Sequence, residues 1–129
     1  MTFFPVLEAA EGGDCHEADG DGHIRGENSG QASFHIDEDP CEDGDAEEVD
    51  AKDPSGNTDF HSTQILSVAF DDIAHTITIA GVGLNNGVPV TFTAVAVDNG
   101  QPALDMFSLT LSDGYANSGN LLDGSIMLY

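Results

Sequence analysis

Acidic residues alternate with glycine in a short stretch whose spacing suits a calcium ion. Residues 17–28 read EADGDGHIRGEN, and calcium-binding loops place oxygen ligands at alternate positions around a turn glycine. No flanking helix is expected, so this would be an isolated calcium loop, and a solvated acidic turn is the alternative. The expected ligands are the side chains of Glu17, Asp19, Asp21 and Glu27 and the main-chain carbonyl of His23.

Two further groups of oxygen-bearing side chains could bind calcium. The first is a cluster of closely spaced carboxylates, which repel one another unless a cation intervenes. It comprises Asp37, Glu38, Asp39, Asp43, Asp45, Glu47 and Glu48. The second comprises Asp98, Asn99 and Asp105, which flank a turn between predicted strands. An acidic loop without a fixed structure is the alternative for the first group. Hydrogen bonds from side chains to the turn backbone are the alternative for the second.

Patterns typical of zinc sites and of catalysis are absent from the sequence. The histidines form no HxxxH pair and the cysteines no CxxC pair, which disfavours zinc. His61 and Ser62 follow Asp59, but no nucleophile elbow accompanies them. The chain also contains no Trp, a residue on which sugars commonly stack. We therefore expect a protein that is not an enzyme.

The two cysteines, Cys15 and Cys41, both lie in the acidic half of the chain. Neighbouring carboxylates disfavour the thiolate form, so neither cysteine is expected to be a nucleophile. A disulfide between them would stabilise the fold by about 3 kcal/mol and bring two acidic stretches together. A pair of free buried thiols is the alternative.

The charge of the chain excludes several classes of partner. It carries 24 acidic and 2 basic residues, for a net charge of −22. Nucleic acids and anionic membranes require a basic surface, so neither is an expected partner. All but six of the acidic residues lie within residues 1–59. A halophilic surface would spread its acids evenly, so this clustering favours metal-binding loops or a solvated acidic region.

The hydrophobic pattern predicts an all-β protein. Alternating, β-prone stretches separated by turn residues predict strands at 31–36, 58–70, 75–82, 88–97, 106–111 and 120–129. Their spacing is typical of an antiparallel, immunoglobulin-like β-sandwich. We expect one domain over residues 11–129, with long acidic loops at 11–28 and 37–59.

Residues 1–10 form a separate apolar arm, in which Phe3, Phe4, Val6 and Leu7 are expected to make the contacts. An isolated apolar strand must be buried against something. It could fold back onto its own domain, or it could add to the sheet of a neighbouring copy. A head-to-tail contact that does not close produces a filament.

Several motifs occur together in a characteristic order: SGQASFHID at 29–37, FHSTQILSV at 60–68, and a continuous match from residue 76 that includes VDNG at 97–100 and GY at 114–115. In these motifs, residues 29–129 resemble the post-COAP domain of bacterial secreted and surface proteins. The resemblance implies an extracellular β-sandwich with no known catalysis. Residues 1–28 lie outside the match, and residues 37–59 look like an acidic elaboration of one loop.

Taken together, these features predict a structural subunit of an extracellular fibre, stabilised by calcium and assembled with copies of itself through the N-terminal arm. The alternative is a monomeric, secreted calcium-binding adhesion or accessory module.

Overall fold

A computed structural model describes residues 18–26, 28, 30–38, 48–99 and 104–128 of the chain. These residues form β1 (Ala18–Arg25), β2 (Gln31–Glu38), β3 (Glu48–Asp53), η1 (Pro54–Gly56), β4 (Thr58–Asp71), β5 (Thr76–Asn85), β6 (Val88–Val97), β7 (Met106–Leu111), β8 (Ala116–Asn120) and β9 (Asp123–Leu128). None of the described residues belongs to a helix long and apolar enough to cross a membrane.

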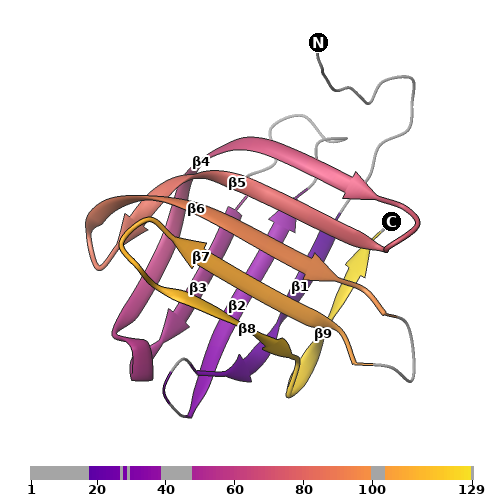
Figure 1. Ribbon diagram of the computed structural model, residues 1–129, viewed down its shortest axis with the longest axis horizontal. Coiled ribbons are helices and arrows are strands. Elements are labelled where there is room, and N and C mark those ends of the chain that lie inside the picture. The colour runs from indigo at the N-terminus through magenta and orange to yellow at the C-terminus, as the bar shows by residue number, and fades with distance from the viewer. Residues whose placement is uncertain (1–17, 27, 29, 39–47, 100–103, 129) are drawn as a thin grey trace.

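The nine strands form one antiparallel sheet. Neighbouring strands follow the order β8-β7-β6-β5-β4-β3-β2-β1-β9, so the last strand returns to pair with the first. The sheet curls into a half-barrel, and β5–β7 lie across its interior from β1–β3 (Figure 1). The prediction of an all-β, antiparallel fold is confirmed. The finer prediction, an immunoglobulin-like sandwich of two separate sheets, is not shown, because hydrogen bonds join the described strands into a single sheet.

The long strand β4 joins the two halves of the curl. Residues 58–61 pair with β3, and β4 pairs with β5 from Phe60 to Asp71. The β4–β5 register shifts between Ser62 and Gln64 and again between Ile65 and Ser67. Such bulges bend a strand and increase its twist. Here they accompany the turn of the sheet from one half to the other (Figure 1).

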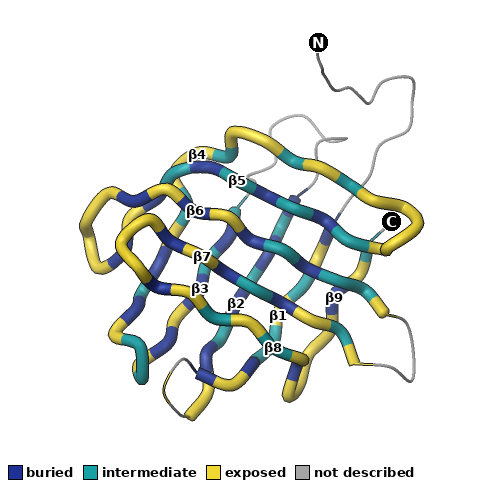
Figure 2. Tube along the Cα trace, in the orientation of Figure 1, coloured by how far each residue is buried: buried dark blue, intermediate teal, exposed yellow. Residues whose placement is uncertain are grey.

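Alternating side chains fill the interior of the curl. Buried and exposed positions follow one another along most strands (Figure 2), as expected because successive side chains point to opposite faces. Phe34 of β2 stacks on Phe107 of β7, with ring centroids 4.2 Å apart, and Phe60 packs against Phe92 at 5.0 Å. These two contacts join strands from opposite halves of the sheet.

Two strands occupy stretches that the sequence predicted as acidic loops. The first is β1, which pairs with both β2 and β9. The second is β3, in which Val49 and Ala51 are buried. The loop prediction is wrong for residues 18–25 and 48–53. Acids dominate the outward faces of both stretches, and the inward positions include Gly20 and Gly22 in β1 and Asp53 in β3, which weaken the apolar alternation. The predicted strand at 120–129 is likewise interrupted, since β8 ends at Asn120 and β9 begins at Asp123.

Candidate metal centre

The outward side chains of β9, β1, β2, β3 and the first part of β4 form a surface that we call the acid–histidine face. Register aligns its members in rows across the strands. Adjacent strands lie about 4.8 Å apart, so neighbours in a row can bind one ion together. The face comprises Asp19, Asp21, His23, Arg25, Gln31, Ser33, His35, Asp37, Glu48, Asp50, Lys52, Asp59, His61, Asp123, Ser125 and Met127.

The closest grouping of ligand atoms on this face is formed by His35, Asp37 and Glu48. One ligand atom from each of the three lies within 4.8 Å of the other two, and all three side chains are half-buried. Asp37 pairs directly with Glu48 in the β2–β3 register, while His35 lies two residues before Asp37 on the same face of β2. An imidazole and two carboxylates are a ligand set that divalent metal ions accept.

Two carboxylates of β1 lie beside this trio. Asp19 of β1 pairs with Asp37, and Asp21 pairs with His35. Both carboxylates are exposed. Two rows of acids therefore face solvent from three adjacent strands, and the negative potential between them attracts cations.

The histidines on this face contact carboxylates. His35 Nε2 lies 3.4 Å from Glu48, His23 Nδ1 lies 2.7 Å from Asp123, and each of these side chains is at least 40% exposed. Solvent-exposed ion pairs of this kind contribute only about 0.2–1 kcal/mol each. They position the imidazoles and contribute little to the stability of the fold.

His61 is flanked by two carboxylates. Its Nδ1 lies 3.0 Å from Asp50, and its Nε2 lies 3.2 Å from Asp59. The adjacent Ser62 does not join this group, because its hydroxyl accepts a hydrogen bond from the main chain of Val49. Both ring nitrogens of His61 contact carboxylates, so His35 is the better metal ligand of these two histidines.

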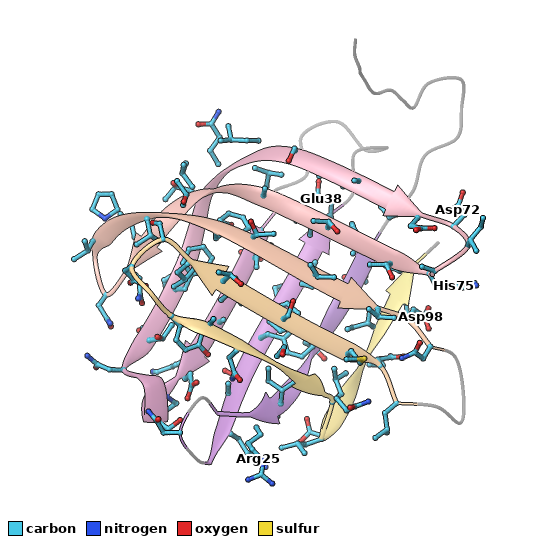
Figure 3. The ribbon with its side chains drawn as sticks, viewed as in Figure 1. Arg25, Glu38, Asp72, His75 and Asp98 are labelled. Atoms are coloured by element: carbon cyan, nitrogen blue, oxygen red, sulfur yellow. The ribbon has the colours of Figure 1, made fainter. Side chains whose placement is uncertain are left out.

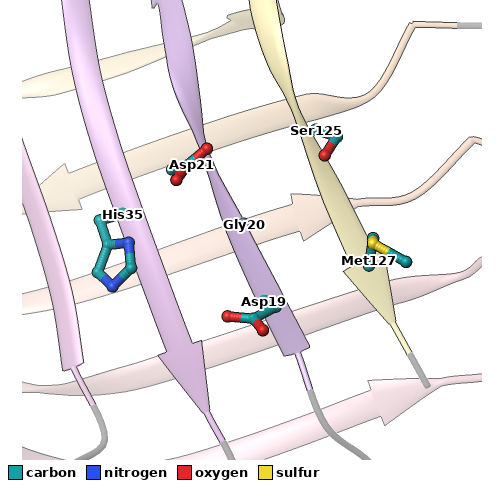
Figure 4. A pocket seen from close by; sticks show the side chains of 6 residues that line it. All are labelled: Asp19, Gly20, Asp21, His35, Ser125 and Met127. Carbon is teal, nitrogen blue, oxygen red and sulfur yellow. The ribbon is translucent and has the colours of Figure 1, made fainter.

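Two shallow hollows lie on the acid–histidine face. The first, of about 260 Å³, is lined by side chains of β1, β2 and β9, including Asp19, Asp21 and His35 (Figure 4). The second, of about 390 Å³, lies over β2, β3 and β4 and includes Asp50 and His61. Both are open to solvent, which suits a hydrated ion.

The stretch predicted as a calcium loop is extended. Asp19, Asp21 and His23 lie on the outward face of β1, so they cannot wrap around one ion as a loop would. The glycine expected at a sharp turn, Gly22, instead pairs with Gly124 of β9. A Cβ added at Gly22 would lie 2.2 Å from the carbonyl oxygen of Asp123, so this glycine permits close approach of two strands.

The third predicted group serves the backbone. Asp105 Oδ1 accepts a hydrogen bond from the main chain of Asn99 at 2.9 Å, and its Oδ2 accepts one from Ile126 of β9 at 2.8 Å. Asp98 Oδ2 accepts one from Leu128 at 3.3 Å, and Figure 3 places Asp98 just beyond the end of β6. These carboxylates hold the outer edge of β9 beside β6 and β7, and blunt an edge that could otherwise pair with another chain.

The remaining predicted residues lie outside the described part of the chain. They are Glu17, Glu27, Asp39, Asp43, Asp45 and Glu47, the cysteines Cys15 and Cys41, and Phe3, Phe4, Val6 and Leu7 of the arm. The sequence placed Asp37 and Glu48 in one acidic cluster, but it did not predict that His35 joins them. His35 and Asp37 have the i, i+2 spacing of one strand face, but their meeting with Glu48 depends on a β2–β3 register that the sequence did not reveal.

Comparisons with known proteins give no relative. No family model, no curated protein and no solved structure matches this chain. The resemblance to the post-COAP domain therefore stays a prediction.

Proposed function

We propose that the protein is a non-catalytic structural subunit of an extracellular fibre, stabilised by calcium on the acid–histidine face and assembled through its N-terminal arm. The observation that carries the proposal is the alignment of carboxylates from three adjacent strands, with Asp19, Asp37 and Glu48 in one row. In a chain of net charge −22, these acids repel one another, and a divalent cation would relieve that repulsion.

The arrangement favours weak, hydrated binding. A sheet surface offers ligands from one side only, so a bound calcium ion would keep several waters, and its dissociation constant would resemble the roughly 10⁻⁴–10⁻³ M of extracellular calcium modules. Calcium takes oxygen ligands, so it suits the carboxylate row. Zinc accepts an imidazole nitrogen, so it would compete at His35, Asp37 and Glu48.

The extracellular and structural parts of the proposal have separate support. Calcium at such affinities is bound where its concentration is high, outside the cell. The stacking of Phe34 on Phe107 across the curl packs the two halves of the sheet face to face, in keeping with the sandwich module that the motif resemblance implies. The two hollows are shallow and open, which is more typical of a surface that binds ions than of a site that transforms a substrate.

Calorimetric titration tests the ion site directly. Calcium added to EDTA-treated protein should bind, and the double variant Asp37→Asn/Glu48→Gln should weaken that binding at least tenfold. The control, Asp71→Asn/Asp72→Asn, makes the same change of charge on two exposed acids, at the end of β4 and in the turn that follows it. If the two double variants lose equal affinity, binding is a diffuse effect of net charge and the site does not exist.

The alternative function is a monomeric, secreted calcium-binding adhesion or accessory module. Such a module would have the same ion site but would not assemble, so the particle mass in solution distinguishes it from a fibre subunit. Deleting residues 1–9 should abolish large assemblies of the fibre subunit. The same deletion would leave the mass per particle of a monomeric module unchanged apart from the residues removed.

A further inference from the structure

The outward side of β4–β8 contrasts with the acid–histidine face. It comprises the side chains that point away from the core along residues 64–71, 76–84, 89–97, 106–110 and 116–120. We call it the hydroxyl face, because serine and threonine are its commonest residues. β5–β7 lie across the interior from β1–β3, so the two faces are on opposite sides of the molecule (Figure 1). Within these ranges the one charged residue is Asp71, at the end of β4.

The centre of the hydroxyl face is built from short side chains. Ala80, Thr93 and Thr110 are direct neighbours on β5, β6 and β7 and form one row across the strands. Thr91, Thr93 and Thr110 are exposed among the described residues (Figure 2). β-branched side chains have few rotamers, so they lose little conformational entropy when another surface covers them.

Larger apolar side chains lie at the two ends of this face. Leu84, at the end of β5, is 38% exposed, and Val88 in the following hairpin is 59% exposed. At the opposite end, where β7 begins, Leu104 is 58% exposed and Met106 is 39% exposed. An uncharged surface with exposed apolar side chains at both ends is typical of a surface that binds another protein.

We propose that the hydroxyl face packs on the hydroxyl face of a second copy of the chain, related to the first by a two-fold axis. A hydroxyl group both donates and accepts hydrogen bonds, so rows of threonine and serine are complementary to themselves. A two-fold contact uses the same surface on both copies, so it requires this self-complementarity. The contact is independent of the N-terminal arm and goes beyond the proposed function.

Charge favours this face as the contact between two copies of a chain whose net charge is −22. Stacked sheets lie about 10 Å apart, so two cores and the contact between them would separate the two acid–histidine faces by roughly 30 Å. The Debye length at physiological ionic strength is about 8 Å, so solvent ions would screen most of the repulsion across that distance. A contact through the acid–histidine face would instead bring like charges together, among them Asp37 and Glu48.

The size of the hydroxyl face suits a modest interface. Strands about 4.8 Å apart that rise about 3.3 Å per residue give the face an area of roughly 600 Å² in each copy. Two copies would therefore bury roughly 1,200 Å², which is at the lower end of the range for specific, stable interfaces. Such a contact would form a discrete dimer of a single subunit. In a fibre assembled through the arms it would join two filaments side by side.

Charged variants of the full-length chain test the contact. Thr93 lies at the middle of β6, the central strand of the face, so a two-fold axis through the centre of the contact places it opposite its own copy. Thr93→Glu and Thr93→Lys should each weaken association at least tenfold, because like charges then meet. An equimolar mixture of the two variants should associate within threefold of the wild type, because opposite charges then meet.

Light scattering gives the readout for either form of assembly. The mass per particle of a dimer, or the mass per unit length of a fibre, should halve in each Thr93 variant and recover in the mixture. Gln31→Glu and Gln31→Lys are the matched controls, since they add the same charged side chains at an exposed residue at the start of β2, on the opposite side of the molecule. Both controls should associate as the wild type does.

The outcomes separate this inference from the proposed function. If wild-type fibres keep their mass per unit length in the Thr93 variants, the contact is wrong and assembly through the arm stands. If the wild type is a discrete dimer that both variants dissociate, the contact is right and the fibre is wrong. A wild type that stays monomeric at concentrations well into the micromolar range overturns the contact. Failure of the mixture to recover also overturns it, because the face then binds a surface other than itself.

Discussion

The hydroxyl of Tyr115 donates a hydrogen bond of 2.8 Å to Oδ2 of Asp53, and this contact is buried. Asp53 ends β3, and its Oδ1 accepts hydrogen bonds from the main chains of Ser55 and Gly56 in η1. Tyr115 lies in the turn between β7 and β8. The pair thus ties the two halves of the curled sheet together at one end, through a buried carboxylate that accepts both local and cross-sheet hydrogen bonds.

Tyr115→Phe removes the donor and leaves the buried Oδ2 of Asp53 with one hydrogen bond fewer. Hydrogen bonds to charged groups contribute about 1.5–3 kcal/mol, so we expect a loss of that size in the free energy of unfolding, measured in urea. Thr63→Val removes an exposed hydrogen bond to the carbonyl of Val82 and should cost about 0.5 kcal/mol or less. Equal losses in the two variants would contradict a structural role for the buried pair.

Asp105→Ala should release the outer edge of β9. The main-chain N–H groups of Asn99 and Ile126 lose their acceptor, so we expect a loss of about 2 kcal/mol and faster amide exchange at Ile126. Asp72→Ala, an equal change of charge in an exposed turn, is the control. The loss should be the same with and without EDTA. A loss seen only when calcium is present would instead make Asp105 an ion ligand.

Gly22→Ala should push β9 away from β1. The added Cβ would lie 2.2 Å from the carbonyl oxygen of Asp123, so the strands must separate. Forced repacking of this kind typically costs about 1–3 kcal/mol. At Gly119 a Cβ would meet only Ile24, at 4.0 Å, so Gly119→Ala should be nearly neutral. The hypothesis of close strand approach fails if the two substitutions destabilise the protein equally in thermal unfolding.

His35→Gln should distinguish two ions at the trio of His35, Asp37 and Glu48. Zinc would lose its imidazole nitrogen, so its affinity should fall at least tenfold, whereas calcium depends on the two carboxylates and should change less than threefold. His75→Gln, in the β4–β5 turn away from this face, is the matched control (Figure 3). Equal losses for both ions would show that the imidazole acts through the structure of the face.

Where alternation was strong, the sequence predicted the fold well. β5 and β6 carry regular apolar periods around an Asn-Gly turn, and both were predicted. β1 was missed because its inward positions include two glycines, Gly20 and Gly22, which carry no hydrophobic signal. The ADGDG pattern of this strand is also compatible with a calcium loop. Only the pairing with Gly124 on β9, more than a hundred residues later, separates the two readings.

The candidate site was harder to predict than the strands. A metal site on a sheet is assembled across strands, so its members are set by register, which local patterns do not determine. Asp19 and Asp21 were predicted as ligands of a loop, and they lie instead on the outward face of β1, opposite Asp37 and His35 of β2. Asp105 was predicted as a calcium ligand, with hydrogen bonds to the turn backbone as the alternative. The sequence could not predict the hydrogen bond that its second oxygen accepts from Ile126, because β9 is distant along the chain.

The central claim, that divalent cations on the acid–histidine face stabilise the protein, is tested most directly by thermal unfolding after removal of metal with EDTA. Calcium at 10–100 times its dissociation constant, bound at one site, should stabilise the folded protein by about 1.4–2.7 kcal/mol. This raises the midpoint of thermal unfolding by roughly 5–10 °C. Sodium chloride at matched ionic strength measures simple screening of the −22 charge. The account predicts a clear excess for calcium that Asp37→Asn/Glu48→Gln removes. An equal rise with sodium, or no rise with calcium, would contradict it.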